Sequence, residues 1–181
     1  MILCVKQTNH LAGQVIPPSS KSQSIRGMIL ALLAKGESTL INPLNSDDMQ
    51  DAIKVCIQLG ANIAIGKDRL MIQSSGLPLR TETQNINTGN SGITTLFVMP
   101  VLGLRYNTDN PIILDCGEQM RARPIQSLVD ALRTLGLTIQ YLDKDGKLPV
   151  AIFGQLQGGV AEVDGITSQY LSALLISFPC A

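Results

Sequence analysis

The chain has 181 residues, enough for one or two domains with a sizeable hydrophobic core. Its 14 basic and 14 acidic residues cancel, and only 15% of residues are charged, which argues against nucleic acid or an anionic membrane as the main partner. No apolar run approaches the roughly 18 residues of a membrane span, and residues 1–6 do not resemble a secretion signal. The composition predicts a cytoplasmic chain whose partner is a small molecule.

The cysteines and the single histidine form no metal-binding pattern. His10 has no cysteine beside it, so a surface position is expected. The cysteines lack CxxC spacing and mostly sit in apolar segments, which favours buried free thiols over disulfides or zinc ligands. They are Cys4, Cys56, Cys116 and Cys180. We therefore expect no metal site.

The first notable segment is 20–26, Ser-Lys-Ser-Gln-Ser-Ile-Arg, which combines two cations with three hydroxyls. Apolar residues follow at the spacing of one buried helical stripe, and Gly36 is expected to end this helix. The prolines at 17–18 forbid helix before it, so Ser19 or Ser20 would cap the first turn.

A helix that begins in this way offers a place for an anion. The free N–H groups of the first turn and the positive end of the helix dipole favour a phosphate or a carboxylate. Lys21 and Arg26 lie five residues apart, so they do not stack on one face, but both can extend toward an anion beyond the helix end. The alternative is a solvated cap without a function, the commoner role of a Ser/Lys-rich turn.

An internal repeat organises the rest of the chain. Each copy is expected to read helix, strand, helix, strand, strand, led into by a short extended segment such as 15–16. Gly60 and Gly136, which end the second helix of the first two copies, lie 76 positions apart. The expected strands are 39–41, 61–65, 112–114 and 137–141, and the expected later helices contain 49–57, 94–102, 125–135 and 171–175.

Three helix N-termini occupy related positions in this repeat. Ser22, Ser91 and Ser168 are separated by 69 and 77 residues, close to the repeat length. If the units are related by pseudo-symmetry, these N-termini converge and form a polar floor suited to a phosphorylated, hydroxyl-rich ligand. Taken one at a time, the segments around Ser91 and Ser168 are more simply ordinary helix caps.

Five motifs carry a resemblance to a known family. They are Pro-Ser-Ser-Lys-Ser-Gln-Ser-Ile-Arg at 18–26, Asn-Ser-Asp-Asp at 45–48, Gly-Asn-Ser-Gly at 89–92, Arg-Ala-Arg-Pro-Ile at 121–125 and Val-Asp-Gly-Ile-Thr-Ser-Gln-Tyr-Leu at 163–171. In order and spacing the chain resembles 5-enolpyruvylshikimate-3-phosphate synthases (3-phosphoshikimate 1-carboxyvinyltransferases) over essentially its whole length.

The resemblance implies an α/β fold, an inverse α/β barrel-like enolpyruvyl transferase fold built from repeated βαβαββ units. Members have two domains and are more than twice as long as this chain. Residues 1–15 would then hold the first strand or strands of an otherwise missing first domain. Residues 16–181 would form the second domain, with about two and a half units, the third of which is truncated.

The resemblance also implies a reaction without metal or cofactor. The family transfers the enolpyruvyl group of phosphoenolpyruvate to the 5-hydroxyl of shikimate 3-phosphate and releases phosphate through a tetrahedral intermediate, a step of aromatic amino acid biosynthesis and the target of glyphosate. Two anions must be held side by side, which explains the need for cations and helix dipoles. The acid–base groups come from the other domain, so this chain alone is expected to be inactive.

The motifs carry over a set of substrate-binding residues and no catalytic one. The residues implied for shikimate 3-phosphate are Lys21, Ser22, Arg26, Thr167, Ser168 and Gln169, with Thr167 in place of the family's usual serine. Those implied for phosphoenolpyruvate are Lys21, Asn90, Gly92, Arg123 and Gln169. After 89–92 the chain departs from the family pattern, because Ile93, Leu96 and Phe97 replace the usual threonine and arginine, so a cation is missing there.

Several of these positions also have plain structural interpretations. Arg123 precedes Pro124, the expected first helical residue, and could be a solvated residue before the helix. Asp47 and Asp48 are most simply first-turn acids after a cap at Ser46, and we do not assign them a catalytic role. The remaining polar residues expected to be solvated in loops and turns are Gln119, Arg121, Asp143 and Lys144.

A rival function from another class is that of a non-catalytic fragment that binds a sugar phosphate or serves as the partner of a separate domain. In either case the expected partners are small molecules and the missing half of the enzyme, with no nucleic acid and no membrane.

Overall fold

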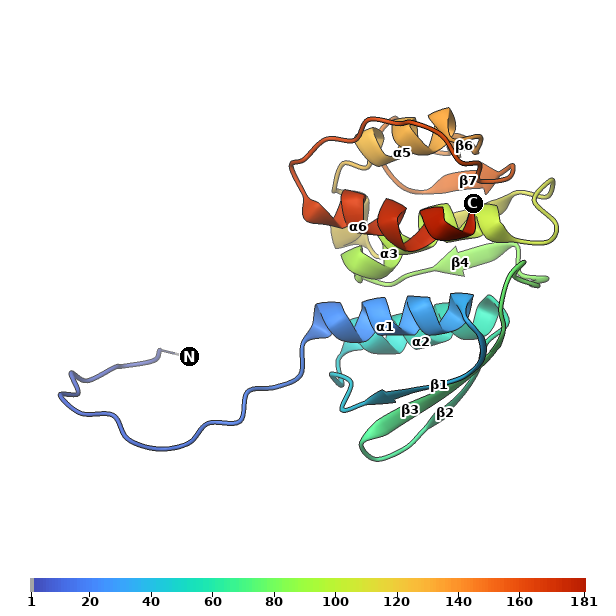
Figure 1. Cartoon of the computed structure of the whole chain (residues 1–181). Coiled ribbons are helices and arrows are strands. Elements are labelled where there is room, and N and C mark those ends of the chain that lie inside the picture. The colour runs from blue at the N-terminus through green and yellow to red at the C-terminus, as the bar shows by residue number, and fades with distance from the viewer. Residues whose placement is uncertain (1) are drawn as a thin grey trace.

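The computed structural model describes residues 2–181, as two β-sheets packed against a group of helices (Figure 1). Residues 2–20 contain no helix or strand and extend away from the packed part. The elements of the first half are α1 (Lys21–Leu33), β1 (Lys35–Ile41), α2 (Asp47–Gln58), β2 (Asn62–Ile65) and β3 (Arg69–Ser75). Those that follow are β4 (Asn85–Asn87), α3 (Gly92–Val101), η1 (Leu102–Leu104), β5 (Ile112–Asp115), α4 (Glu118–Arg121), α5 (Gln126–Thr134), β6 (Thr138–Tyr141), β7 (Val150–Phe153), α6 (Ser168–Ser177) and η2 (Phe178–Cys180).

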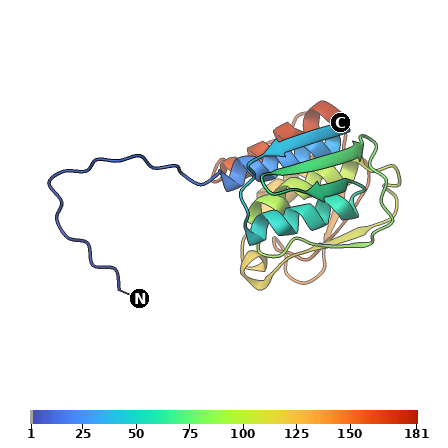
Figure 2. The same cartoon turned by 90° about the horizontal axis from the view of Figure 1, so that it is seen from below.

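The two sheets repeat one plan. The first has the order β1-β3-β2 and is antiparallel, and it lies over the helices in Figure 2. The second has the order β4-β5-β7-β6, in which β4 and β5 are parallel and the other pairs antiparallel. The second copy therefore reads β4-α3-β5-α5-β6-β7 with the short α4 inserted, which confirms the βαβαββ repeat.

The first copy lacks a leading strand among residues 2–181. The edge of β1 is unpaired there, whereas the corresponding edge of β5 pairs with β4. The expected extended segment 15–16 forms no strand and both of its side chains are exposed. The assignment of 1–15 to a first domain stays a prediction, and Met1 lies outside the described residues.

Helix α3 forms the centre of the core. All ten of its residues are buried, from Gly92 to Val101, and it contacts α1, α2 and α6. The departures noted in the sequence lie in this core: Ile93 and Leu96 are 6% and 4% exposed, and Phe97 is fully buried. A helix that is apolar on all sides needs such enclosure, because every face must leave water.

The predicted elements are confirmed within a few residues, with two corrections at helix ends. Helix α1 ends at Leu33, not at Gly36, because the chain enters β1 at Lys35 and pairs with β3 along its whole length. Gly36 adopts a φ of 110° inside that strand. Pro124 is not the first helical residue, since α5 begins at Gln126.

The cysteine prediction is half right. Cys56 and Cys116 are buried, while Cys4 and Cys180 are exposed, and all four are free thiols. His10 is exposed, as expected. Among residues 2–181, none of the helices has the length and apolar character needed to cross a membrane.

Candidate anion-binding site

Helices α1, α3 and α6 begin at the same end of the molecule, at the left of Figure 1. Each has a hydroxyl cap: Ser20 Oγ accepts from Gln23 N at 3.3 Å, and Ser91 Oγ accepts from Thr94 N at 3.4 Å. In α6, Thr167 Oγ1 accepts from Gln169 N at 3.2 Å. The predicted capped N-termini are therefore confirmed.

The three serines Ser22, Ser91 and Ser168 do not occupy equivalent positions in their helices, although their spacing suggested that they would. Of the three serines compared, only Ser91 is itself a cap. Ser22 lies two residues after the cap of α1, and Ser168 is the first residue of α6. The caps that correspond by position are Ser20, Ser91 and Thr167, so the three first turns remain equivalent although the serines do not.

Arg26 joins these three helices. It extends from α1, where its Nη1 donates to the Ser22 carbonyl oxygen at 3.3 Å. Its Nη2 donates to Ser172 Oγ on α6 at 3.1 Å, and its guanidinium carbon lies 5.3 Å from the centre of the Phe97 ring on α3. The half-buried cation thus contacts all three copies of the repeat.

The two cations of the first segment differ in their partners. Lys21 Nζ lies 2.7 Å from Asp48 Oδ2 at the first turn of α2. Arg26 has no carboxylate within 4.0 Å among residues 2–181, so its charge is balanced only by neutral acceptors and an aromatic face. A half-buried cation without a counter-charge favours a bound anion.

A second cation lies against the N-terminus of α3. A Cβ added to Gly92 would come within 3.0 Å of Arg123 Nη1 and 3.4 Å of Met120 Sδ. Gly92 and Arg123, both implied for phosphoenolpyruvate, thus lie next to each other although 31 positions separate them, and their role in binding stays a prediction. Arg123 is exposed, and like Arg26 it has no ion-pair partner in the described part of the chain.

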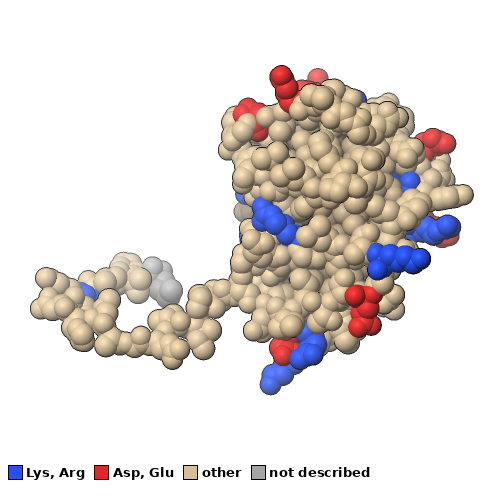
Figure 3. All heavy atoms as spheres, viewed as in Figure 1, with Lys and Arg blue, Asp and Glu red and all other residues tan. Residues whose placement is uncertain are grey.

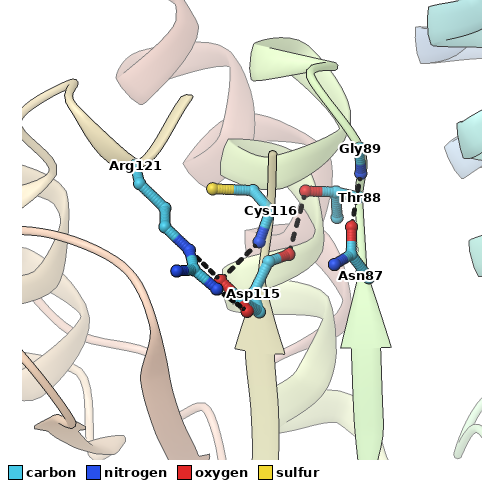
Figure 4. A network of polar contacts seen from close by, with 6 residues as sticks. All are labelled: Asn87, Thr88, Gly89, Asp115, Cys116 and Arg121. Atoms are coloured by element: carbon cyan, nitrogen blue, oxygen red, sulfur yellow. Dashed lines mark hydrogen bonds and ion pairs between the residues drawn. The ribbon is translucent and has the colours of Figure 1, made fainter. Parts of the chain in front are cut away.

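A polar network holds the loop that precedes α3 (Figure 4). Asn87 Oδ1 accepts from Gly89 N at 2.9 Å, and the Thr88 backbone N–H donates to the carbonyl oxygen of Asp115 at 3.0 Å. Gly117 N donates to the Gly89 carbonyl oxygen at 2.6 Å, which ties the ends of β4 and β5 together. The Asn90 amide covers Gly117 so closely that a Cβ there would overlap it.

Asp115 and Arg121 form the charged part of this network. Arg121 Nε donates to Asp115 Oδ1 at 2.8 Å, Arg121 Nη2 donates to Oδ2, and the Cys116 backbone N–H donates to Oδ1 at 2.7 Å. Burial alone would raise the pKa of Asp115, but these hydrogen bonds and the arginine charge together lower that pKa below its ordinary value. The expectation that Gln119 and Arg121 lie in a loop is wrong, because both belong to α4. Both are exposed, as expected, and Arg121 also takes part in this pair.

Hydroxyl groups beneath the loop complete one another's hydrogen bonds. Thr88 Oγ1 and Thr95 Oγ1 are 2.6 Å apart, and Thr95 Oγ1 donates to the Ser91 carbonyl oxygen at 2.8 Å. Ser91 Oγ and Thr94 Oγ1 are 2.7 Å apart. These buried groups are satisfied internally, so they fix the start of α3.

The structure brings the predicted residues together in two groups. One contains Ser22 and Arg26 with the start of α6, and the other contains Gly92 and Arg123. Ser168 and Asn90 are exposed, and Thr167 and Gln169 are half-buried. On the face shown in Figure 3, basic and acidic side chains are interspersed and most of the surface is uncharged. The attraction of an anion therefore depends on the residues of the site more than on the net charge of this face.

Sequence reasoning missed the supporting residues. Asp48 was interpreted as a helix acid, yet it also pairs with Lys21. No local sequence pattern identifies Phe97 and Ser172 as contacts of Arg26, because both lie far from Arg26 in the chain. Only the pair Asp115 and Arg121 had a local signal, opposite charges six residues apart after a strand.

The fold and these contacts define a class: an α/β domain of repeated βαβαββ units, with helix N-termini and two arginines that lack ion-pair partners among residues 2–181. The model of the family EPSP synthase (3-phosphoshikimate 1-carboxyvinyltransferase) matches residues 5–181. The chain belongs to this family.

Relatives agree with that assignment. The 3-phosphoshikimate 1-carboxyvinyltransferase of Acetivibrio thermocellus is 37% identical over 179 residues, covering 99% of this chain and 41% of that protein. The protein of the same name from Histophilus somni (strain 2336) is 37% identical over 182 residues, covering 98% and 42%. An EPSP synthase structure from Acinetobacter baumannii has the same fold, with a TM-score of 0.81 at 22% identity over 91% of this chain and 38% of that one. The chain thus spans about two fifths of the length of these relatives.

Proposed function

We propose that the complete protein transfers the enolpyruvyl group of phosphoenolpyruvate to the 5-hydroxyl of shikimate 3-phosphate and releases phosphate. Family membership supports this reaction, and the observation that carries it is Arg26. This half-buried cation contacts three capped helices and has no carboxylate within 4.0 Å among residues 2–181. The protein would act in the cytoplasm, in aromatic amino acid biosynthesis, and would be a target of glyphosate.

The shikimate 3-phosphate site in this proposal lies between α1 and α6. Its residues are Lys21, Ser22, Arg26, Thr167, Ser168 and Gln169. The hydrogen bond of 3.1 Å from Arg26 to Ser172 supports the pairing of these two helices, because it links the second turn of α1 to the second turn of α6. The phosphate would accept from the remaining guanidinium N–H groups and from first-turn N–H groups, which complement its charge.

The phosphoenolpyruvate site in this proposal lies at the start of α3. Its residues are Lys21, Asn90, Gly92, Arg123 and Gln169. Gly92 lets the anion approach the backbone, since a side chain there would meet Arg123. Arg123 would grip a carboxylate or phosphate with two parallel N–H groups, and Lys21 would exchange Asp48 for the anion.

This chain would contribute binding and orientation to the reaction. Holding two anions side by side makes the attack of a hydroxyl effectively intramolecular, and fixed donors stabilise the charge that develops in the tetrahedral intermediate. The proton transfers need groups within hydrogen-bond reach of the reacting atoms, which the proposal assigns to the remaining three fifths of the protein. The chain alone is predicted to release no phosphate.

A phosphate-release assay with both substrates tests the reaction, using the full-length gene product and the 181-residue chain. Isothermal titration with shikimate 3-phosphate tests the site. Arg26→Ala should abolish binding, whereas Arg69→Ala, at an exposed arginine on β3, should leave it unchanged. A full-length product that binds neither substrate would overturn the proposal.

A second candidate is a non-catalytic module that binds a sugar phosphate. It is favoured by the fact that Arg26, Ser22 and the start of α6 all belong to this chain. Binding of shikimate 3-phosphate by the 181-residue chain, together with a full-length product that shows no turnover, would support this candidate over the transferase.

A further inference from the structure

Two residues outside the proposed ligand set contact the Arg26 guanidinium. Phe97 is fully buried on α3, and the guanidinium carbon lies 5.3 Å from the centre of its ring. Ser172 lies on α6, and its Oγ accepts from Arg26 Nη2 at 3.1 Å. They approach the cation from two different copies of the repeat, so neither contact follows from the helix that carries Arg26.

These contacts leave Arg26 able to bind a further group. A guanidinium has five N–H donors, and the hydrogen bonds to Ser22 and Ser172 use one on each Nη. Nε and the second hydrogen of each Nη remain. Neither hydrogen-bond partner is a carboxylate, so the positive charge of Arg26 remains available to bind an anion. The face of the Phe97 ring attracts the cation but does not neutralise it.

Arginine has a long side chain, and fixing it costs conformational entropy when a ligand binds. A site in which the guanidinium is already held binds more tightly, because that cost is met during folding. The guanidinium lies over the Phe97 ring, and one of its Nη atoms donates to Ser172. The Ser22 carbonyl fixes a third point within α1 itself.

We propose that Phe97 and Ser172 are positioning residues that hold Arg26 in the orientation in which it binds a phosphate monoester. The identity of that monoester as shikimate 3-phosphate rests on the proposed function. The proposal also gives α6 a role in the site. Among the hydrogen bonds of residues 2–181, the one to Ser172 alone connects the Arg26 guanidinium to α6, which belongs to the third copy of the repeat.

The test uses two measurements on the 181-residue chain and its variants. The Arg26 side-chain 15Nε–1Hε heteronuclear NOE reports whether the guanidinium is held, and it needs no ligand. Titrations with shikimate 3-phosphate and with phosphoenolpyruvate report affinity. The disruptive variants are Phe97→Leu and Ser172→Ala, the conservative variant is Ser172→Thr, and the control is Met99→Leu at another fully buried position of α3.

We expect the Arg26 NOE to fall in Phe97→Leu and Ser172→Ala. The Kd for shikimate 3-phosphate should rise roughly threefold to thirtyfold, the range that a cation–π contact or a charge-assisted hydrogen bond is worth, with a smaller change for phosphoenolpyruvate. Ser172→Thr should restore both values, and Met99→Leu should leave both unchanged.

Three results would separate the possibilities. If Arg26 stays as ordered in both disruptive variants as in the parent chain, the positioning role is overturned. If order is lost but the two Kd values stay unchanged or rise together, the assignment of Arg26 to shikimate 3-phosphate and not to phosphoenolpyruvate is overturned. If the parent chain binds no shikimate 3-phosphate while order still depends on Phe97 and Ser172, the positioning role is supported and the proposed function fails for this chain.

Discussion

Arg123 Nη1 lies where it would be only 3.0 Å from a Cβ on Gly92, so the first residue of α3 and the arginine after α4 share one small space. Such a distance is shorter than ordinary van der Waals contact. The contacting atom is the end of a flexible side chain, so a Cβ would displace the guanidinium and leave the backbone in place.

Gly92→Ala should therefore weaken phosphoenolpyruvate binding with little loss of stability. A helical position favours alanine over glycine by about 0.5–1 kcal/mol, and this gain in stability offsets the cost of moving Arg123. Titration of phosphoenolpyruvate and urea denaturation check the two parts. Gly158→Ala is the control, because a Cβ at Gly158 would meet no atom within 4 Å. Equal binding by Gly92→Ala and the parent protein would contradict the assignment.

Lys21 is held by Asp48 before any ligand binds, with 2.7 Å between Nζ and Oδ2. Because this carboxylate competes with an anionic ligand for the same ammonium, Asp48→Asn should lower the Kd for shikimate 3-phosphate by up to about fivefold. The pair is partly exposed, so the free energy of unfolding should change by less than about 1 kcal/mol.

The matched control for this prediction is Asp47→Asn, which removes the same charge from the same helical turn without breaking the contact to Lys21. An equal gain in affinity from both variants would mean that net charge, and not the release of Lys21, governs binding.

The sequence predicted the features that depend on neighbouring residues. The caps at Ser20 and Ser91 follow from a hydroxyl placed just before an apolar helical stripe, and both are confirmed. The repeat followed in the same way from period and spacing. Helix α4 was missed because four residues carry no periodic signal, and it is held by the tertiary pair between Asp115 and Arg121.

The missed parts of the site depend on contacts between distant segments. Arg26 and Ser172 are 146 positions apart, and no local pattern in either helix predicts their hydrogen bond. The start of β1 at Lys35 was likewise set by its pairing with Ser75 on β3. Local chemistry therefore predicted the caps and the candidate binding residues, whose role in binding stays a prediction, while packing decided which residues contact them.

The pair between Asp115 and Arg121 should make stability depend on pH. The pKa of Asp115 is lowered in the folded state, because hydrogen bonds from Arg121 and Cys116 outweigh the effect of burial. The stabilisation is therefore fully present above the ordinary pKa of 3.8 and is lost as the pH falls through the lowered value. Asp115→Asn should reduce the free energy of unfolding by about 1 kcal/mol at neutral pH, and by less below that window.

Urea denaturation of the parent protein and Asp115→Asn at several pH values between 7 and 3 measures this difference. Asp109→Asn, at an exposed loop carboxylate, serves as the control. A difference between parent and Asp115→Asn that stays constant down to the lowest pH would show that the pair does not account for the lowered pKa.

The four cysteines should fall into two reactivity classes. Burial raises the pKa of Cys56 to about 12. Burial, with the charge of Asp115 as a smaller cause, raises the pKa of Cys116 to about 11. Since the thiolate is the reactive form, an alkylating reagent at pH 8 should modify Cys4 and Cys180 in the native protein, and Cys56 and Cys116 only after unfolding.

Mass spectrometry of digested samples assigns each modified cysteine, and a protein with Cys4→Ser and Cys180→Ser should be unreactive until denatured. Native labelling of Cys116 at the rate of Cys180 would mean that the loop between β5 and α4 opens readily.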